Sequence, residues 1–240
     1  CTNENIEVVN PISMNNCFKE DVGIFSGTHV RKVDPIVLEE LEKKNCLIHS
    51  ENYQHSYPHC WRHKTPLIFM ATPQWFISMT KSGLIDGANR AIQDVKFIPE
   101  WGKERMEIML KDRPDWCISR QRDWGIPIPL FFESESGELH PEQNEIFNKA
   151  SEAIKKTGID SWKNLELGVD DKGFEKSKDI FDVWFDSGIT HYCVMDERFG
   201  SNTQADLYLE GSDQHRGWFQ SSLLTSIAMK GTSPFKSVLT

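Results

Sequence analysis

The chain has 240 residues, and its 27 Lys and Arg against 36 Asp and Glu give a formal net charge of −9. With 38% hydrophobic and 26% charged residues, this composition excludes a disordered tail and a collagen-like fibre. A membrane protein is excluded as well, because no run of about 18 apolar residues is present. The length is sufficient for about one and a half ordinary domains.

The chain begins at Cys1 with neither a Met nor a charged-then-apolar leader. We therefore expect no signal peptide, and we expect a piece of a longer polypeptide. The six cysteines are widely and irregularly spaced, whereas a disulfide scaffold would be shorter and denser in Cys. They predict reduced thiols in a cytoplasmic protein.

In residues 1–55, one helix is clearly predicted. Asp34 is a good N-cap, Pro35 suits the first helical position, and Asn45 can close the helix in a left-handed conformation. Further along, the apolar run 67–71 predicts a buried strand, and residues 102–113 predict a helix.

The next segment, 116–132, predicts irregular strands and loops around Gly125 and two prolines. Residues 56–130 carry 11 basic and 8 acidic side chains, a net charge of +3 that can attract a polyanion locally but is weak support for nucleic-acid binding by itself.

The remaining chain changes character twice. Residues 133–178 are polar and acidic, with a predicted helix over 141–156 that Gly158 closes, and they have the composition of a variable insertion. Beyond them, 180–185 and 207–209 predict strands, and Ser212 is expected to cap a helix that runs to about residue 229. Strand, turn and helix in repetition are typical of a parallel α/β sheet.

The strongest candidate site is the block 210–218, EGSDQHRGW, at the predicted junction of strand end and helix start. Ligands of open α/β sheets bind outside the carboxyl ends of the strands. Glu210 can accept hydrogen bonds from an ammonium group or a ribose hydroxyl, and Gly211 allows a ligand to approach the backbone. A capped helix start with solvated charges explains the same block.

Two further patterns each have a functional and a structural interpretation. Trp184 in DVWFDSG (182–188) is either an aromatic wall for an apolar ligand group or ordinary packing beside a turn. Arg120 and Arg122, spaced i, i+2 beside Trp124, suit phosphate binding and base stacking, or they are surface arginines that cover a Trp.

The His and Cys residues at 55–63 are weak candidates for zinc ligands. His59, Cys60 and His63 provide a first ligand group, but no Cys-x-x-Cys or His-x-x-Cys pair follows. A packed cluster of His, Cys and Trp explains them better, so no metal ligand is predicted.

Taken together, five blocks resemble the bacterial isoleucyl-tRNA synthetases, which belong to the class I aminoacyl-tRNA synthetases. The resemblance extends from about residue 8 to Thr240, in the family's order and spacing. The matching blocks are YPHCWRHKTP (57–66), ATPQWF (71–76), RPDWCISRQR (113–122), DVWFDSG (182–188) and YLEGSDQHRGWF (208–219). The last block resembles the isoleucine enzymes more than their valine and leucine relatives.

The resemblance implies a role for each matched residue. Isoleucyl-adenylate would be held by Glu210, Gly211, Asp213 and Gln214. The isoleucine side-chain pocket would be lined by Trp184 and Trp218. Arg120 and Arg122 are the candidate tRNA contacts. No catalytic side chain is assigned, since the chemistry depends on positioning and electrostatic stabilisation.

The resemblance also implies an α/β fold: the second half of a Rossmann-type parallel-sheet catalytic domain, with a connective region and the tail of the editing insertion. The expected domains are the editing tail (1–55), the connective region (56–132), the acidic insertion (133–178) and the catalytic half (179–240). The implied partners are tRNA(Ile), isoleucine, ATP with Mg²⁺ as substrate, and the rest of the same polypeptide. A cytoplasmic monomer without membrane contact is expected.

Several family features are missing from these residues. The nucleotide-binding signatures HIGH and KMSKS and the editing His and Asp do not occur, so this piece is expected to be inactive alone. Some relatives have a Cys at the position of His63 and a second Cys pair near 133–137, where this chain reads ESESG, which argues against zinc. Met70 stands where many relatives have Arg, and nothing in the sequence explains it.

A second hypothesis is a free-standing, non-catalytic tRNA- or RNA-binding module with a decayed half-site. It rests on the basic stretch 56–130 and on the tryptophans interleaved with it. These are Trp61, Trp75, Trp101, Trp116 and Trp124.

Overall fold

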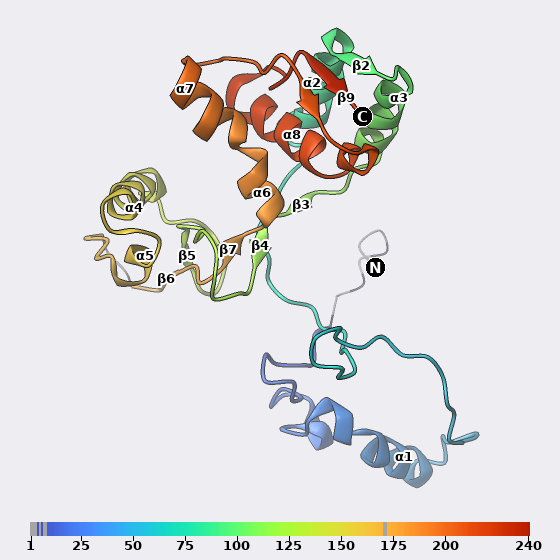
Figure 1. The fold of residues 1–240 in the computed structure, drawn as a ribbon. Helices are drawn as coiled ribbons and strands as arrows, with labels where there is room; N and C mark the ends of the chain where they lie inside the picture. Colours follow the sequence, from blue (N-terminus) through green and yellow to red (C-terminus); the bar gives the residue numbers. More distant parts are fainter. Residues whose placement is uncertain (1–3, 5, 7–8, 170–171) are drawn as a thin grey trace. The chain divides into compact units, whose positions relative to one another are not determined.

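The computed structural model (Figure 1) describes residues 4, 6, 9–169 and 172–240. It divides the chain into two compact units, Cys1–Pro73 and Gln74–Thr240, and each is described by itself. The division falls inside the predicted connective region, whose boundaries stay a prediction. Within the described ranges, no helix combines the length and the hydrophobicity that a bilayer crossing requires.

In the first unit, the one α-helix among the described residues is α1 (Asp34–Lys43). Asn45 adopts the predicted left-handed conformation, with φ of 57°. The predicted N-cap is wrong by one position: Val33 precedes the helix, and Asp34 already belongs to its first turn. Short 3-10 helices, Gly23–Phe25 and Val30–Lys32, lead into α1.

The buried strand predicted over 67–71 does not form. Phe69 is 81% exposed and Leu67 is 44% exposed. The chain here is joined to its neighbour by a bridge between His59 and Pro66 and by a hydrogen bond from Leu67 N to Pro58 O (3.0 Å). The described residues of the first unit offer this run no strand with which to pair, and a buried strand needs partners for its backbone groups.

The second unit is built on a three-stranded parallel sheet. Its strands are β2 (Lys96–Ile98), β8 (Tyr208–Leu209) and β9 (Ser237–Leu239), in the order β2-β9-β8. Val238 of β9 pairs with Phe97 on one side and with Tyr208 on the other. A parallel α/β sheet that contains the predicted strand 207–209 is therefore confirmed. Its other two strands, β2 and β9, were not predicted, and the second predicted strand, 180–185, lies outside this sheet.

Three helices share the main core with this sheet. α2 (Leu84–Ala91), α3 (Trp101–Lys111) and α8 (Trp218–Lys230) bury apolar side chains together, and Figure 1 shows them around β2 and β9. The predicted helix 102–113 is confirmed with small shifts at both ends. The helices contribute Leu84, Ala88, Met106, Leu110, Phe219, Leu223 and Leu224, all buried.

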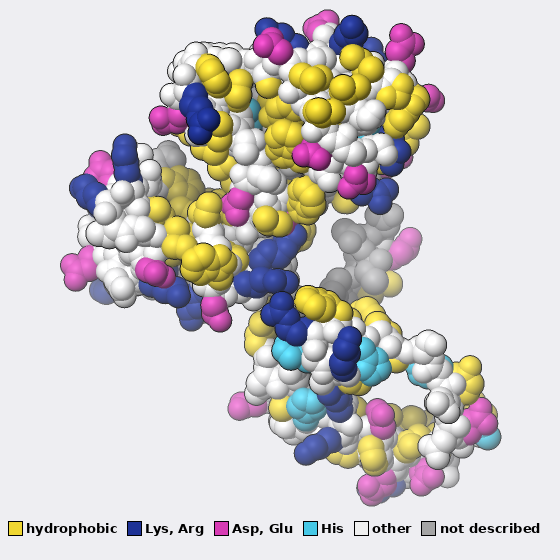
Figure 2. Space-filling model, viewed as in Figure 1, with side chains coloured by type: hydrophobic (Ala, Val, Ile, Leu, Met, Phe, Trp, Pro, Cys, Tyr) yellow, Lys and Arg dark blue, Asp and Glu magenta, His cyan; other side chains and the backbone are white. Residues whose placement is uncertain are grey.

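A second lobe of this unit contains the acidic insertion (Figure 1). β5 (Phe131–Glu133) and β6 (Phe174–Lys176) pair antiparallel and pack with α4 (Gln143–Thr157) and α5 (Ser161–Asn164) around a separate small core. The predicted helix ending at Gly158 is confirmed. Figure 2 shows acidic and basic side chains interspersed over the face of this lobe that is in view.

Short antiparallel pairs connect the two lobes. β1 (Phe76–Ile77) pairs with β3 (Trp116–Cys117), and β4 (Ser119–Arg120) pairs with β7 (Ile180–Phe181). The prediction of irregular strands and loops over 116–132 is confirmed.

Two predicted elements are wrong in this region. The strand 180–185 ends at Phe181, and α6 (Val183–Gly188) follows because the Asp182 carboxylate accepts a hydrogen bond from Trp184 N (3.3 Å) as an N-cap. The continuous helix from Ser212 is a 3-10 helix, Ser212–His215, followed by α8. The break occurs where Gln214 Oε1 accepts from Trp218 N (2.9 Å).

Beyond α6 the chain forms a π-helical turn, His191–Asp196, and α7 (Glu197–Phe199).

Close packing of α6 on α8 depends on Gly188. Thr225 of α8 donates to Gly188 O (2.9 Å), so the two backbones approach at this glycine. A Cβ atom there would lie 3.1 Å from both C and O of Ser221, which is backbone that cannot rotate away.

Gly188→Ala is therefore expected to destabilise the chain by about 1–3 kcal/mol, the usual cost of overpacking. Urea unfolding followed by tryptophan fluorescence measures the change. Ser151→Ala is the control, since it introduces the same side chain at an exposed position of α4. Equal losses in the two variants would contradict the importance of the α6–α8 backbone contact.

Candidate functional site

The predicted polar block lies at the carboxyl edge of the parallel sheet. Glu210 follows β8 directly, is exposed, and donates its backbone N–H to Leu239 O of β9 (3.4 Å). Gly211 continues in an extended conformation, and Asp213 lies exposed in the 3-10 helix. This edge is where open α/β sheets bind ligands, so the structure places the block as the sequence predicted.

Gln214 is held in one orientation by two hydrogen bonds. Its Nε2 donates to Asp213 Oδ2 (3.0 Å), and its Oε1 accepts from Trp218 N (2.9 Å). The amide thus links an exposed carboxylate to the first turn of α8. A Cβ at Gly211 would lie 2.7 Å from Asp213 Oδ1, so the glycine makes room for that carboxylate.

The structure brings Trp184 to this block from 30 residues away in the sequence. A Cβ at Gly217 would lie 3.0 Å from Trp184 Cζ3 and 2.6 Å from Gln214 Oε1. The indole edge and the amide oxygen therefore both closely approach one glycine. Because Trp184 is 43% exposed, its indole offers an apolar surface beside polar groups.

Trp218, the second predicted pocket residue, is more firmly packed. Its ring stacks on Tyr208 with centroids 4.1 Å apart and an interplanar angle of 4°. Its Nε1 donates to Ser187 O (3.0 Å) and to Thr190 Oγ1 (3.3 Å), which ties α8 to α6. Burial raises the pKa of Tyr208, so this phenol stays neutral under the ring.

The sequence analysis missed His215, which lies beneath the block. The side chain is fully buried, with ring contacts to Phe97 and Trp101, and its Nδ1 lies 2.8 Å from Ser212 O. Burial lowers its pKa, so the ring is neutral and fixes the 3-10 helix to the core. Only its position within the block EGSDQHRGW could have indicated it.

The two candidate tRNA arginines lie in different surroundings. Arg120 Nη2 forms an ion pair with Asp182 Oδ2 (3.1 Å), and its Nη1 donates to Ser119 O (2.8 Å). β4 ends at Arg120, so Arg122 lies beyond the strand. Arg122 is exposed and lines a cavity of about 610 Å³, together with Trp124.

Among the described His and Cys residues of the first unit, Cys60 and His63 lie close together. Cys60 Sγ lies 3.5 Å from His63 Nδ1. Hydrogen bonds from the backbone N–H groups of His63 and Arg62 lower the pKa of the Cys60 thiol. In residues 4, 6, 9–169 and 172–240, no group of three or more His, Cys, Asp or Glu side chains can hold a metal ion.

Comparison with known proteins identifies the family. The profile of the family described as "tRNA synthetases class I (I, L, M and V)" matches residues 5–240. The chain belongs to the class I tRNA synthetases. Membership of this family accounts for the mixed α/β fold and for the parallel sheet that carries the polar block.

Individual relatives are isoleucine–tRNA ligases. The chain is 53% identical to the ligase of Vibrio vulnificus (strain YJ016) over 98% of its own length and 25% of that protein. It is 54% identical to the ligases of Marinomonas sp. (strain MWYL1) and Teredinibacter turnerae, again over 98% of this chain and 25% and 26% of those proteins. This class I synthetase chain therefore spans about a quarter of the length of the curated relatives it matches.

Proposed function

We propose that this chain forms part of the isoleucyl-adenylate site of an isoleucine–tRNA ligase. The observation that carries the proposal is the approach of both the half-exposed Trp184 indole and the Gln214 amide to Gly217, at the carboxyl edge of a parallel sheet. An apolar surface beside polar groups suits isoleucyl-adenylate, which joins an aliphatic side chain to an ammonium group, a phosphate and a ribose. The names of the relatives support isoleucine as the amino acid.

Each predicted residue then has a role in binding. Trp184 and Trp218 line the side-chain pocket. The Glu210 carboxylate accepts from the ammonium group or a ribose hydroxyl, and Gly211 lets the adenylate approach the backbone. Asp213 and Gln214 supply the remaining polar contacts.

The proposed chemistry has two steps. The isoleucine carboxylate attacks the α-phosphate of ATP, which releases pyrophosphate and leaves the adenylate. A terminal ribose hydroxyl of tRNA then attacks the acyl carbon, and AMP leaves. Both steps depend on orientation and charge stabilisation, which suits a site without a nucleophilic Ser or Cys. Mg²⁺ accompanies ATP as substrate, and no step is assigned to a metal ligand of this chain, in whose described residues no suitable group occurs.

The finer assignments belong to the same proposal. Residues 1–55 are the tail of the editing domain, 56–132 the connective region, 133–178 the acidic insertion and 179–240 the second half of a Rossmann catalytic domain. The rest of the ligase supplies the HIGH and KMSKS signatures, and the complete protein is a cytoplasmic monomer. High identity along nearly the whole chain supports this assignment over a free-standing module with a decayed half-site.

The direct test is amino-acid-dependent ATP–pyrophosphate exchange by the full-length protein that carries this sequence. Isoleucine, valine, leucine and methionine are the four arms, matching the specificities of the family. We expect the highest kcat/KM with isoleucine and no exchange from the 240-residue chain alone. A preference for another amino acid would overturn the proposed substrate, and exchange by the isolated chain would overturn the partial site.

Contact with tRNA is expected at Arg122. Trp124 is 84% exposed and lines the same cavity, and an arginine beside an exposed indole suits phosphate contact and base stacking. Arg122→Ala is expected to weaken tRNA binding and to lower the slope of log K against log salt by about 1. Filter binding at several salt concentrations measures both quantities.

Lys155→Ala, on the exposed surface of α4, is the charge-matched control for Arg122→Ala. An equal effect of the two variants would show a diffuse electrostatic contact and would contradict a specific role for Arg122. Strong, salt-sensitive binding of tRNA by the isolated 240 residues would favour the binding-module hypothesis instead.

A further inference from the structure

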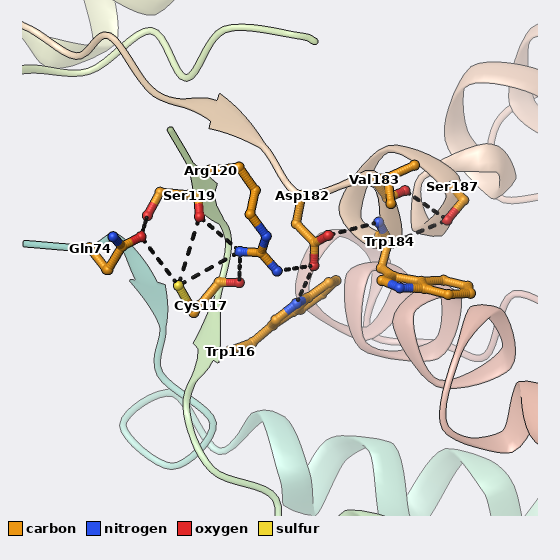
Figure 3. A network of polar contacts seen from close by, with 9 residues as sticks. All are labelled: Gln74, Trp116, Cys117, Ser119, Arg120, Asp182, Val183, Trp184 and Ser187. Atoms are coloured by element: carbon orange, nitrogen blue, oxygen red, sulfur yellow. Dashed lines mark hydrogen bonds and ion pairs between the residues drawn. The ribbon is translucent and has the colours of Figure 1, made fainter. Parts of the chain in front are cut away.

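Asp182 is a buried carboxylate that three other residues hold between them (Figure 3). The residue is 5% exposed. Its Oδ2 lies 3.1 Å from Arg120 Nη2 and accepts from Trp116 Nε1 (3.4 Å), while its Oδ1 accepts from Trp184 N (3.3 Å). A buried charge is stable only when it is paired and hydrogen-bonded, so this set of contacts acts as a unit.

On one side, the network fixes the backbone of Trp184. Asp182 caps α6 through Trp184 N, and Ser187 Oγ bonds to Trp184 O (3.3 Å) and to Val183 O (3.0 Å). Both polar backbone groups of Trp184 therefore have partners in this short helix. With the backbone fixed, the indole lies against Gly217, where the proposed pocket begins.

On the other side, the network is anchored in β4. Arg120 Nη1 donates to Ser119 O (2.8 Å) and Cys117 O (3.1 Å), which fixes the guanidinium. Ser119 is itself buried, and its Oγ donates to Gln74 Oε1 (2.8 Å) (Figure 3). The β4–β7 register, in which Arg120 pairs with Ile180, brings the guanidinium to Asp182.

Asp186 shows that the negative charge of Asp182 matters in α6. Burial, followed by repulsion from Asp182, raises the pKa of the Asp186 carboxyl. Removal of the Arg120 charge would leave Asp182 without its cationic partner in the same small region. Without that partner, water would compete with Trp184 N for the Asp182 carboxylate, and the helix cap would weaken.

We propose that Asp182, held by Arg120 and Trp116, is a positioning residue that orients Trp184 and thereby sets the isoleucine selectivity of the pocket. The proposal rests on the proposed function, because it requires Trp184 to contact the amino acid. Asp182 touches no substrate and acts through the backbone of Trp184. In this scheme Arg120 serves the amino-acid pocket rather than tRNA.

The test is isoleucine-dependent ATP–pyrophosphate exchange by the full-length ligase without tRNA. Asp182→Asn keeps an acceptor for Trp184 N and loses the ion pair, and Arg120→Ala removes the cation. We expect each to raise the KM for isoleucine about tenfold and to lower the isoleucine-to-valine ratio of kcat/KM, with the KM for ATP within about twofold. Arg120→Lys keeps the charge but not the fork, so it should lie between wild type and Arg120→Ala.

Asp206→Asn is the matched control, since it removes the same charge from an exposed ion pair with Lys236 (2.7 Å). Unfolding midpoints of all variants separate loss of fold from loss of position. Equal rises in the KM values for isoleucine and ATP, or an unchanged isoleucine-to-valine ratio, would overturn the positioning role. So would an Arg120→Ala variant that weakens only tRNA binding.

Trp184→Ala separates a failure of the proposed pocket from a failure of the positioning role of Asp182. If Trp184→Ala raises the KM for isoleucine and Asp182→Asn does not, the positioning role fails while the proposed pocket stands. If Trp184→Ala leaves that KM unchanged, the pocket fails and the positioning role fails with it.

Discussion

Replacing Trp184 by Ala in the full-length protein that carries this sequence is expected to lower kcat/KM for isoleucine in ATP–pyrophosphate exchange by about 30- to 150-fold, if the proposed function holds. The indole is a half-exposed apolar surface beside Gly217, so its removal would take one wall from the proposed pocket. Loss of that contact is worth about 2–3 kcal/mol, and every 1.4 kcal/mol corresponds to about a tenfold change in rate. The effect should appear mainly in the KM for isoleucine, because the proposed contact of the indole is with the isoleucine side chain rather than with the nucleotide.

A second variant tests the polar half of the same site. Glu210→Ala removes the acceptor proposed for the ammonium group or a ribose hydroxyl, and hydrogen bonds to charged groups are worth about 1.5–3 kcal/mol. Trp61→Ala is the matched control for Trp184→Ala. It truncates a tryptophan of the first unit that is 76% exposed, and it should leave exchange unchanged. Exchange that stays unchanged in both Trp184→Ala and Glu210→Ala would refute the site assignment.

The polar block could be predicted from the sequence because its position depends on the pattern of neighbouring residues. A short apolar run followed by Glu210 and Gly211 predicts a strand that ends there, and β8 ends at Leu209. The helices α3 and α4 were predicted for the same reason, since their apolar side chains recur at helical spacing. In each case a few neighbouring residues contain the whole signal.

The contacts that assemble the site come from residues far apart in the chain. DVWFDSG reads as a strand from its apolar run, and the deciding fact is that Asp182 caps a helix while paired with Arg120. The approach of Trp184 to Gly217 depends equally on how α6 packs against α8. Over 67–71 the apolar pattern was present and its partner strand was not, so propensity alone gave the wrong element.

A fall in pH is expected to destabilise the chain through His191. The residue is fully buried, its Nε2 lies 3.1 Å from Thr225 Oγ1, and its Nδ1 has no hydrogen-bond partner among the described residues. Burial first, and then the nearby Lys230 ammonium, lower the pKa of His191 from 6.5 to about 4, against the opposing effect of Asp196. The folded chain therefore keeps a neutral imidazole at pH values where the unfolded chain binds a proton.

The sign follows from the number of protons bound in each state. Above pH 6.5 neither state protonates His191, so its contribution is constant. Between pH 6.5 and about 4 only the unfolded state takes up the proton, and the free energy of unfolding falls by about 1.4 kcal/mol per pH unit, or about 3 kcal/mol in all. Asp196, whose pKa is lowered by Lys230, contributes with the same sign but only below its ordinary value of 3.8.

His191→Gln isolates this contribution, because the amide can still donate to Thr225 and does not titrate. Urea unfolding of both chains at pH 7, 5.5 and 4.5 should show the wild type losing more stability than the variant, by about 1.4 kcal/mol for each pH unit below 6.5. The other carboxyl and imidazole groups titrate equally in both chains and cancel in the difference. Parallel curves would mean that His191 is protonated in the folded chain. A real difference would show that His191 is neutral in the folded chain. Its partner Thr225 also bonds to Gly188 O, so this neutral ring lies at the contact of α6 with α8 that the Trp218 Nε1 hydrogen bond spans.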